Sequence, residues 1–242
     1  MKTFYLLTFL VVAFFSCKPD SKNPDKAGQP RETQDWLILT APEEREVWGV
    51  YGNIDSTLVI STGYKLYYTQ DRGKSWHKSD YSVMAWVMAF APRADTLFTL
   101  SSQWSSSAYP EKYAANPGDY STDQGKSWFS IPPRTLTIAQ RDSLRVPRNR
   151  LKAANGVVYE IDQLLTPTCP NCSSSYVQTI GYKTSTGRRV ALPQEHQIQS
   201  IYLDSQQRLY ISGSAAVCGG IKDFKFCDGQ RGVIYISKKP LP

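Results

Sequence analysis

The chain has 242 residues, of which 41% are hydrophobic and 12% aromatic, and it carries a formal net charge of +7. This composition is too apolar and too aromatic for a disordered chain. The Lys and Arg residues are scattered without a run of four, and no basic stripe alternates with aromatic residues, so we expect no nucleic-acid partner. With 15 Gly, 15 Pro and 15 Tyr and no long stretch of helix formers, the composition predicts an all-β fold.

The first predicted element is an export signal over residues 1–16. It has a basic start and the apolar run FYLLTFLVVAFF, whose 12 residues fall short of the roughly 20 that a membrane-spanning helix needs. Phe15-Ser16-Cys17 follows and resembles the lipobox of bacterial lipoproteins. The resemblance implies that Cys17 is lipidated and holds the chain to a bilayer of the bacterial cell envelope, with the outer membrane expected. The alternative is an ordinary signal peptide with a chance cysteine.

Residues 17–35 are polar, contain Pro and have few large apolar side chains. Such a composition predicts a flexible tether, because it offers little to bury in a core. The folded domain is therefore expected over residues 36–242.

Two segments 52 residues apart repeat one pattern, TQDRGKSW at 69–76 and STDQGKSW at 121–128. Asp followed two positions later by Gly favours a tight turn, since Asp accepts bonds from nearby backbone N–H groups and Gly tolerates a positive φ. The closing Trp can pack between neighbouring sheets. The pattern resembles the Asp-box (BNR) repeat of sialidase-like β-propellers, which implies a structural hairpin away from the ligand-binding face. The residues that carry the pattern are Thr69, Asp71, Gly73, Trp76, Ser121, Asp123, Gly125 and Trp128.

The rest of the chain fits the same period. Residues 36–242 number 207 (242 minus 35), about four times the 52-residue spacing, which predicts a small propeller of four blades with four antiparallel strands each. The predicted second strands are 58–60, 97–100, 157–159 and 209–211, and the predicted third strands end at 69, 121, 184 and 237. The fourth unit stops before its outer strand, so we expect the N-terminal strand at 36–42 to complete the last blade. A five-bladed ring would need a blade without a visible strand pair, and an open two-sheet sandwich is the other alternative.

Extra length falls between the second and third strands, at Gln103–Asp119, Gln163–Tyr176 and Ser214–Gly232, with a further insertion at 134–148 that contains a predicted helical turn. In a propeller these loops share one face, where binding sites are commonly built. Trp104, Tyr109 and Tyr113 are the candidate contacts for a glycan or a protein partner, although the same rings could simply pack their own loop.

Four cysteines remain besides Cys17, and four cysteines permit three pairings. An exported chain meets an oxidising compartment, so disulfides are expected. Proximity in sequence favours Cys218 with Cys227 and leaves Cys169 with Cys172, while a cross-pairing between the two loops stays open. The spacing is poor for a zinc site, and a thioredoxin-type role for the Cys169–Cys172 motif lacks a βαβ context.

The sequence argues against catalysis. The sialidase family requires an arginine triad, a Tyr–Glu pair and an Arg-Ile-Pro motif before the first box, whereas Arg31 and Arg45 are not followed by Ile-Pro. The two histidines, His77 and His196, are far apart, which disfavours a multi-histidine metal site. We therefore expect a membrane-tethered, non-catalytic binding or assembly propeller without metal or cofactor; the alternative is a sialidase-like glycoside hydrolase.

Overall fold

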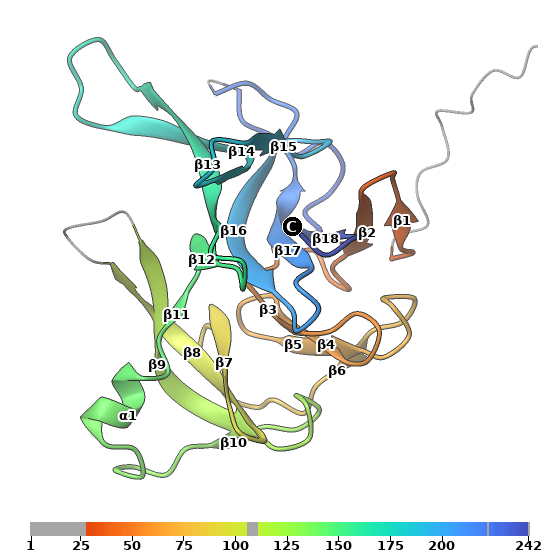
Figure 1. Cartoon of the computed structure of the whole chain (residues 1–242), viewed down its shortest axis with the longest axis vertical. Helices are drawn as coiled ribbons and strands as arrows, with labels where there is room; N and C mark the ends of the chain where they lie inside the picture. Colours follow the sequence, from red (N-terminus) through yellow and green to blue (C-terminus); the bar gives the residue numbers. More distant parts are fainter. Residues whose placement is uncertain (1–27, 106–110, 222, 242) are drawn as a thin grey trace, which may run out of the picture.

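The computed structural model describes residues 28–105, 111–221 and 223–241, and these residues form an all-β protein (Figure 1). The predicted signal segment, Cys17, most of the predicted tether and Tyr109 lie outside the described residues. Within them, the four small antiparallel sheets have four or five strands each and form the four blades of a β-propeller. The predicted fold class is thus confirmed.

Each blade takes its strands from one stretch of the chain, with one exception at the seam. Blade 1 contains β3 (Gly49–Gly52), β4 (Leu58–Ser61), β5 (Leu66–Thr69) and β6 (His77–Lys78). Blade 2 contains β7 (Ala89–Arg93), β8 (Thr96–Ser105), β9 (Lys112–Ser121) and β10 (Phe129–Ser130), and β11 (Val146–Pro147) also pairs with β9. Blade 3 contains β12 (Arg150–Lys152), β13 (Val158–Pro167), β14 (Ser175–Thr184) and β15 (Arg189–Ala191). Blade 4 contains β16 (His196–Leu203), β17 (Leu209–Ala216), β18 (Val233–Ser237), β2 (Trp36–Thr40) and β1 (Arg31–Glu32).

The blade boundaries follow the predicted period closely. The third strands β5, β9, β14 and β18 end at residues 69, 121, 184 and 237, where the sequence predicts them to end. The helical turn in the 134–148 insertion is α1 (Ile138–Asp142), which begins at a capping box in which the Thr137 hydroxyl and the Gln140 side chain each accept from the other residue's backbone N–H.

The ring closes without a covalent link. β2 pairs antiparallel with β18 from Trp36 opposite Ser237 to Thr40 opposite Val233, so the N-terminal strand completes the last blade as predicted. β1 adds a short fifth strand outside β2. Regular structure therefore begins before residue 36, inside the segment expected to be tether, because the turn at Thr33 bonds back to Trp36 and returns the chain along β2.

Three hydrophobic clusters fill spaces between neighbouring blades, and a fourth lies beside blade 2. One cluster packs blade 3 against blade 4 around Tyr182 and Tyr235, a second packs blade 4 against blade 1, and a third packs blade 1 against blade 2. The fourth cluster packs blade 2 against the 131–146 linker, with Leu144 buried beside Phe98. Burial of apolar area between successive sheets is the main force that holds this ring together.

The two repeated segments fold into equivalent hairpin turns. Asp71 accepts from the backbone N–H and hydroxyl of Ser75, and Asp123 accepts from the same groups of Ser127, at 2.5–3.0 Å. Gly73 and Gly125 have φ of +80° and +86°, and a Cβ on either would clash with a side chain of the preceding blade, Leu39 or Val59. The turns therefore also lock each blade to its neighbour, which is why the pattern demands glycine.

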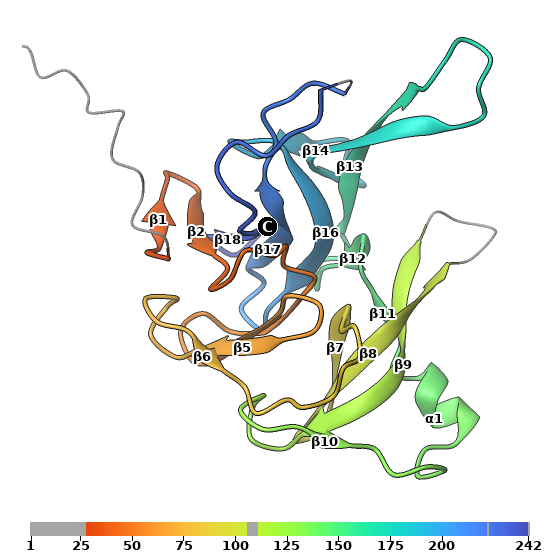
Figure 2. The ribbon, with the colours of Figure 1, turned by 180° about the vertical axis from the view of Figure 1, so that it is seen from behind.

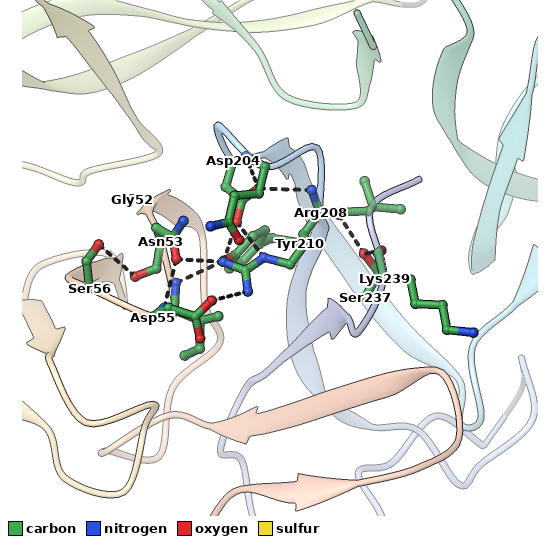
Figure 3. A network of polar contacts seen from close by, with 12 residues as sticks. Gly52, Asn53, Asp55, Ser56, Asp204, Arg208, Tyr210, Ser237 and Lys239 are labelled. Atoms are coloured by element: carbon green, nitrogen blue, oxygen red, sulfur yellow. Dashed lines mark hydrogen bonds and ion pairs between the residues drawn. The ribbon is translucent and has the colours of Figure 1, made fainter. Parts of the chain in front are cut away.

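A polar network joins blade 4 to blade 1 on the face that carries these turns (Figure 3). Arg208 donates to Asp204 at 2.8 Å within blade 4, and to Asp55 at 2.5 Å and Asn53 at 2.6 Å in blade 1. The Tyr210 hydroxyl donates to Asp204 at 3.0 Å and accepts from the backbone N–H of Ile54. The side chain of Asp204 is fully buried and that of Arg208 is 9% exposed, so this ion pair is an interior contact between blades.

Candidate functional site

Two hairpins rise from the face where the second and third strands of each blade are joined, which we call the loop-bearing face. β8–β9 and β13–β14 extend past their neighbouring strands and project from the ring (Figures 1 and 2). The register of each hairpin shifts by one residue near its base, with the extra residue in β9 opposite Phe98 to Leu100 and in β14 opposite Asp162 and Gln163. The sequence predicts loops in both places; the structure instead continues the strands, with cross-strand pairs as far as Ser105 opposite Lys112 and Pro167 opposite Ser175.

The β13–β14 hairpin exposes most of the apolar surface on this face. Five of the ten large apolar side chains exposed among the described residues are Leu164, Leu165, Tyr176, Val177 and Phe224, which we call the apolar rim. Leu165 and Val177 are cross-strand partners, and Leu165 is 59% exposed. Side chains alternate along a strand, so Leu165 and Val177 lie on one face of the hairpin and Leu164 and Tyr176 on the other. Both faces of the projecting hairpin therefore offer apolar area to a partner.

A groove of about 380 Å³ lies between β14 and the loop that carries Phe224. One wall is the segment from Ser175 to Val177, and the other includes Gly219, Ile221 and Phe224. The second wall belongs to the loop that Cys218 and Cys227 close. The groove thus combines a strand that projects from blade 3 with a cross-linked loop from blade 4.

Polar groups form the floor of this groove. Gln178 donates to Glu195 at 3.0 Å, and the Thr179 hydroxyl accepts from the backbone N–H of Ile198 at 2.7 Å. Beneath them His196 is buried, with Nδ1 at 2.9 Å from the Ser214 carbonyl and Nε2 at 2.9 Å from the Tyr235 hydroxyl. Burial lowers the pKa of His196, so the ring is neutral at pH 7.

The cysteines pair as their proximity in sequence predicts. Cys169 and Cys172 are joined by an S–S bond of 2.00 Å, and Cys218 and Cys227 by one of 2.06 Å. The first pair lies at the tip of the β13–β14 hairpin. The structure therefore contains neither a disulfide between the two loops nor a zinc site made from all four sulfurs. Among the described residues no cluster of three or more His, Cys, Asp or Glu side chains could hold a metal ion.

The predicted aromatic contacts lie on the other hairpin. Trp104 in β8 packs on Tyr113 of β9 with ring centroids 5.7 Å apart, and the Arg145 guanidinium lies 4.7 Å from the Trp104 ring. Trp104 still keeps 42% of its surface exposed. The Tyr113 hydroxyl donates to Glu111, and this bond raises the pKa of Tyr113. Neither residue lines the groove.

Sequence reasoning missed the apolar rim, although a signal for it was present. Leu164, Leu165 and Tyr176 stand within a segment that we expected to be a loop, with Val177 just after it, and apolar residues in a loop outside any core are candidates for a contact surface.

A buried arginine lies where the innermost strands meet beneath the loop-bearing face. Arg148 is 3% exposed, donates to the Gln103 side chain at 3.0 Å and the Gln199 carbonyl at 2.9 Å, and lies over the Trp48 ring at 4.9 Å. Burial lowers its pKa to about 10, so the guanidinium stays charged at neutral pH. Arg148 thus links blades 1, 2 and 4 through one side chain.

No protein family model matches the sequence, and no curated protein matches it. Among solved structures, the extracellular domain of a "putative one component system" from B. thetaiotaomicron is similar, with a TM-score of 0.29 and 11% sequence identity. The similarity covers 85% of this chain and 28% of that chain, so the present chain corresponds to less than a third of the solved structure. No helix within the described residues is both long and apolar enough to cross a membrane.

Proposed function

We propose that this chain is a non-catalytic binding module of the bacterial cell envelope, tethered through Cys17, that docks a protein partner on its loop-bearing face. The observation that carries the proposal is the apolar rim, of which Tyr176, Val177 and Phe224 line the groove. Its aliphatic side chains favour a protein over a glycan, since Leu and Val offer apolar area and no hydrogen bonds to sugar hydroxyls. Two disulfides are consistent with an oxidising, extracytoplasmic environment.

The groove also offers a reason for specificity. Gln178 and Glu195 place an amide and a carboxylate at the floor beneath apolar walls, so a partner must match both polar and apolar positions. The two walls are strengthened by the hairpin ladder and by the Cys218–Cys227 disulfide. A surface held in place before docking loses little conformational entropy when it binds.

The test is affinity capture of envelope proteins from the organism that makes the chain, followed by measurement of the Kd for each captured protein. The double substitution Tyr176→Ser with Phe224→Ser should weaken binding by about 2–4 kcal/mol, the sum of two aromatic anchors. Phe129→Ser is the matched control, because Phe129 is equally exposed but lies on β10 at the outer edge of blade 2. A captured protein that is lost equally with both variants, or with neither, would contradict the proposal.

A further inference from the structure

The tip of the β13–β14 hairpin carries the sequence Cys169-Pro170-Asn171-Cys172, and its two cysteines form a disulfide across only three positions of sequence. All four residues are exposed to solvent. None of them belongs to a hydrophobic cluster of the propeller. The sulfurs are therefore accessible to a reactant from solution.

The turn at this tip is already closed by hydrogen bonds. The backbone N–H of Thr168 donates to the Ser174 carbonyl at 3.1 Å, and the Thr168 hydroxyl donates to the same carbonyl at 3.1 Å. The Cys172 N–H donates to the Cys169 carbonyl at 3.1 Å. Because a disulfide stabilises chiefly by closing a loop, and more for longer loops, this bond adds little that the turn lacks.

The second disulfide of the chain shows a contrasting arrangement. Cys218 and Cys227 are nine positions apart; Cys218 is exposed, whereas Cys227 is half-buried. Their loop forms one wall of the groove and is tied to blade 4 by the bond from the Cys227 N–H to the Ala216 carbonyl at 2.8 Å. Reduction of this pair frees a longer loop that carries Phe224, so this disulfide has a structural task.

We propose that Cys169–Cys172 is an exchangeable disulfide that reacts with the thiol of another molecule while the propeller stays folded. A thiolate from solution attacks one sulfur, the Cys169–Cys172 bond breaks, and a mixed disulfide and one cysteine thiolate form. A second thiol of the reactant displaces the chain, so the reactant's two thiols are oxidised to a disulfide and Cys169 and Cys172 become a dithiol. Exposed disulfides that the fold does not need are the kind that exchange readily.

The position of the pair indicates how a protein thiol would reach it. Pro167 pairs with Ser175 beside the tip, and the next cross-strand pairs along the hairpin include Tyr176 and Val177 of the apolar rim. A protein docked on the rim is thus held a few residues from the reactive sulfurs. This choice of a protein reactant depends on the proposed function, whereas the exchange chemistry does not.

The test is a redox titration of the full chain in glutathione buffers at pH 7, with thiols blocked by N-ethylmaleimide and each pair quantified by peptide mass spectrometry. We expect Cys169–Cys172 to reach its midpoint at a glutathione ratio about tenfold less reducing than Cys218–Cys227, which corresponds to about 30 mV. The emission maximum of the tryptophan fluorescence should stay unchanged at that midpoint. Coincident midpoints, or a shift of the tryptophan emission to that of the unfolded chain as Cys169–Cys172 is reduced, would overturn the proposal.

Single variants provide a second measurement of the same property. Cys172→Ser leaves Cys169 as a free thiol, and the matched control Cys227→Ser leaves Cys218. With oxidised glutathione as the probe, Cys169 should form a mixed disulfide about tenfold faster than Cys218, and equal rates would count against exchange at the tip. Because glutathione replaces any protein partner, a negative result here leaves the docking proposal intact, and a failure of docking leaves this result intact.

Discussion

At the scale of single residues, the burial of His196 should be measurable as a pH dependence of the stability of the fold. Both ring nitrogens have partners in the interior, and Arg31 and Glu195 are the charged groups whose fields reach it, with opposite effects. Burial outweighs the favourable contacts and lowers the pKa. The unfolded chain therefore binds a proton on this residue at a pH where the folded chain does not.

This difference predicts that the propeller becomes less stable as the pH falls below about 6.5, the ordinary pKa of histidine. The slope due to His196 should be at most about 1.4 kcal/mol per pH unit and should end below the folded pKa. His196→Gln should remove that part of the slope between pH 7 and pH 5 in urea unfolding experiments. His77→Gln, a change at the exposed histidine of β6, is the control; an identical slope in both variants would show that other groups are responsible.

The repeated turns allow a second prediction at this scale. Asp123→Ala removes the acceptor of two backbone N–H groups and two hydroxyls, so we expect a loss of about 1–3 kcal/mol in the free energy of unfolding. Partner binding should not change, because the turn lies on the face opposite the groove. If Asp123→Ala kept normal stability but lost partner binding, the binding face would be the one that carries the repeated turns and not the one that carries the groove.

At the scale of elements, the two raised hairpins differ in what they offer a partner: β13–β14 carries most of the apolar rim, and β8–β9 carries Trp104 and Tyr113. Trp104 and Tyr113 form their own cluster on β8–β9 and belong to none of the four hydrophobic clusters. A partner wide enough to span both hairpins would contact Trp104 as well as the apolar rim. We therefore expect Trp104→Ala to weaken partner binding by about 1–3 kcal/mol with little change in Tm. The opposite result, a lowered Tm with unchanged Kd, would mean that Trp104 only packs its own hairpin.

The sequence predicts the blades better than the surface between them. The repeated turns and the strand ends at 69, 121, 184 and 237 follow from local chemistry, since Asp-x-Gly and alternating apolar residues act over a few positions. The groove and the apolar rim could not be predicted in the same way. They depend on how far β13 and β14 continue past their neighbours and on which loop of blade 4 faces them, and both are set by packing between blades. The short strand β1 escaped prediction for a related reason, because Arg31 and Glu32 pair only once β2 has been placed.

At the scale of the whole molecule, the network around Arg208 shows how polar contacts hold two blades that are distant in sequence. Arg208→Ala would leave the fully buried carboxylate of Asp204 without its cation, and we expect a loss of about 3–5 kcal/mol in the free energy of unfolding. Arg72→Gln is the matched control, because Arg72 pairs with Asp55 of the same network but is about half-exposed. Its cost should stay below about 1 kcal/mol. If chemical unfolding showed the same loss in the free energy of unfolding for both variants, burial of the ion pair would not explain its contribution to stability.

Closure of the ring yields a further prediction. Deleting residues 36–42 removes β2 and exposes the edge of β18, so we expect aggregation or a broad, non-cooperative melting transition. Deleting residues 18–27 is the control and should change neither. Equal effects of the two truncations on calorimetric melting would rule out the closure model.

The same pairing of β2 with β18 determines when the protein can reach its native state. The two strands come from opposite ends of the domain, so a chain that is still being made or still being exported cannot bring them together. Blades 1 to 3 consist of hairpins whose strands are close in sequence, so each can form without the rest of the chain. The entropic cost of joining distant segments falls on the pairing of β2 with β18. Until then the apolar strand Trp36–Thr40 has only the short strand β1 beside it, and its other edge is open to aggregation. We therefore expect the propeller to complete its folding in a late step that requires both ends of the domain.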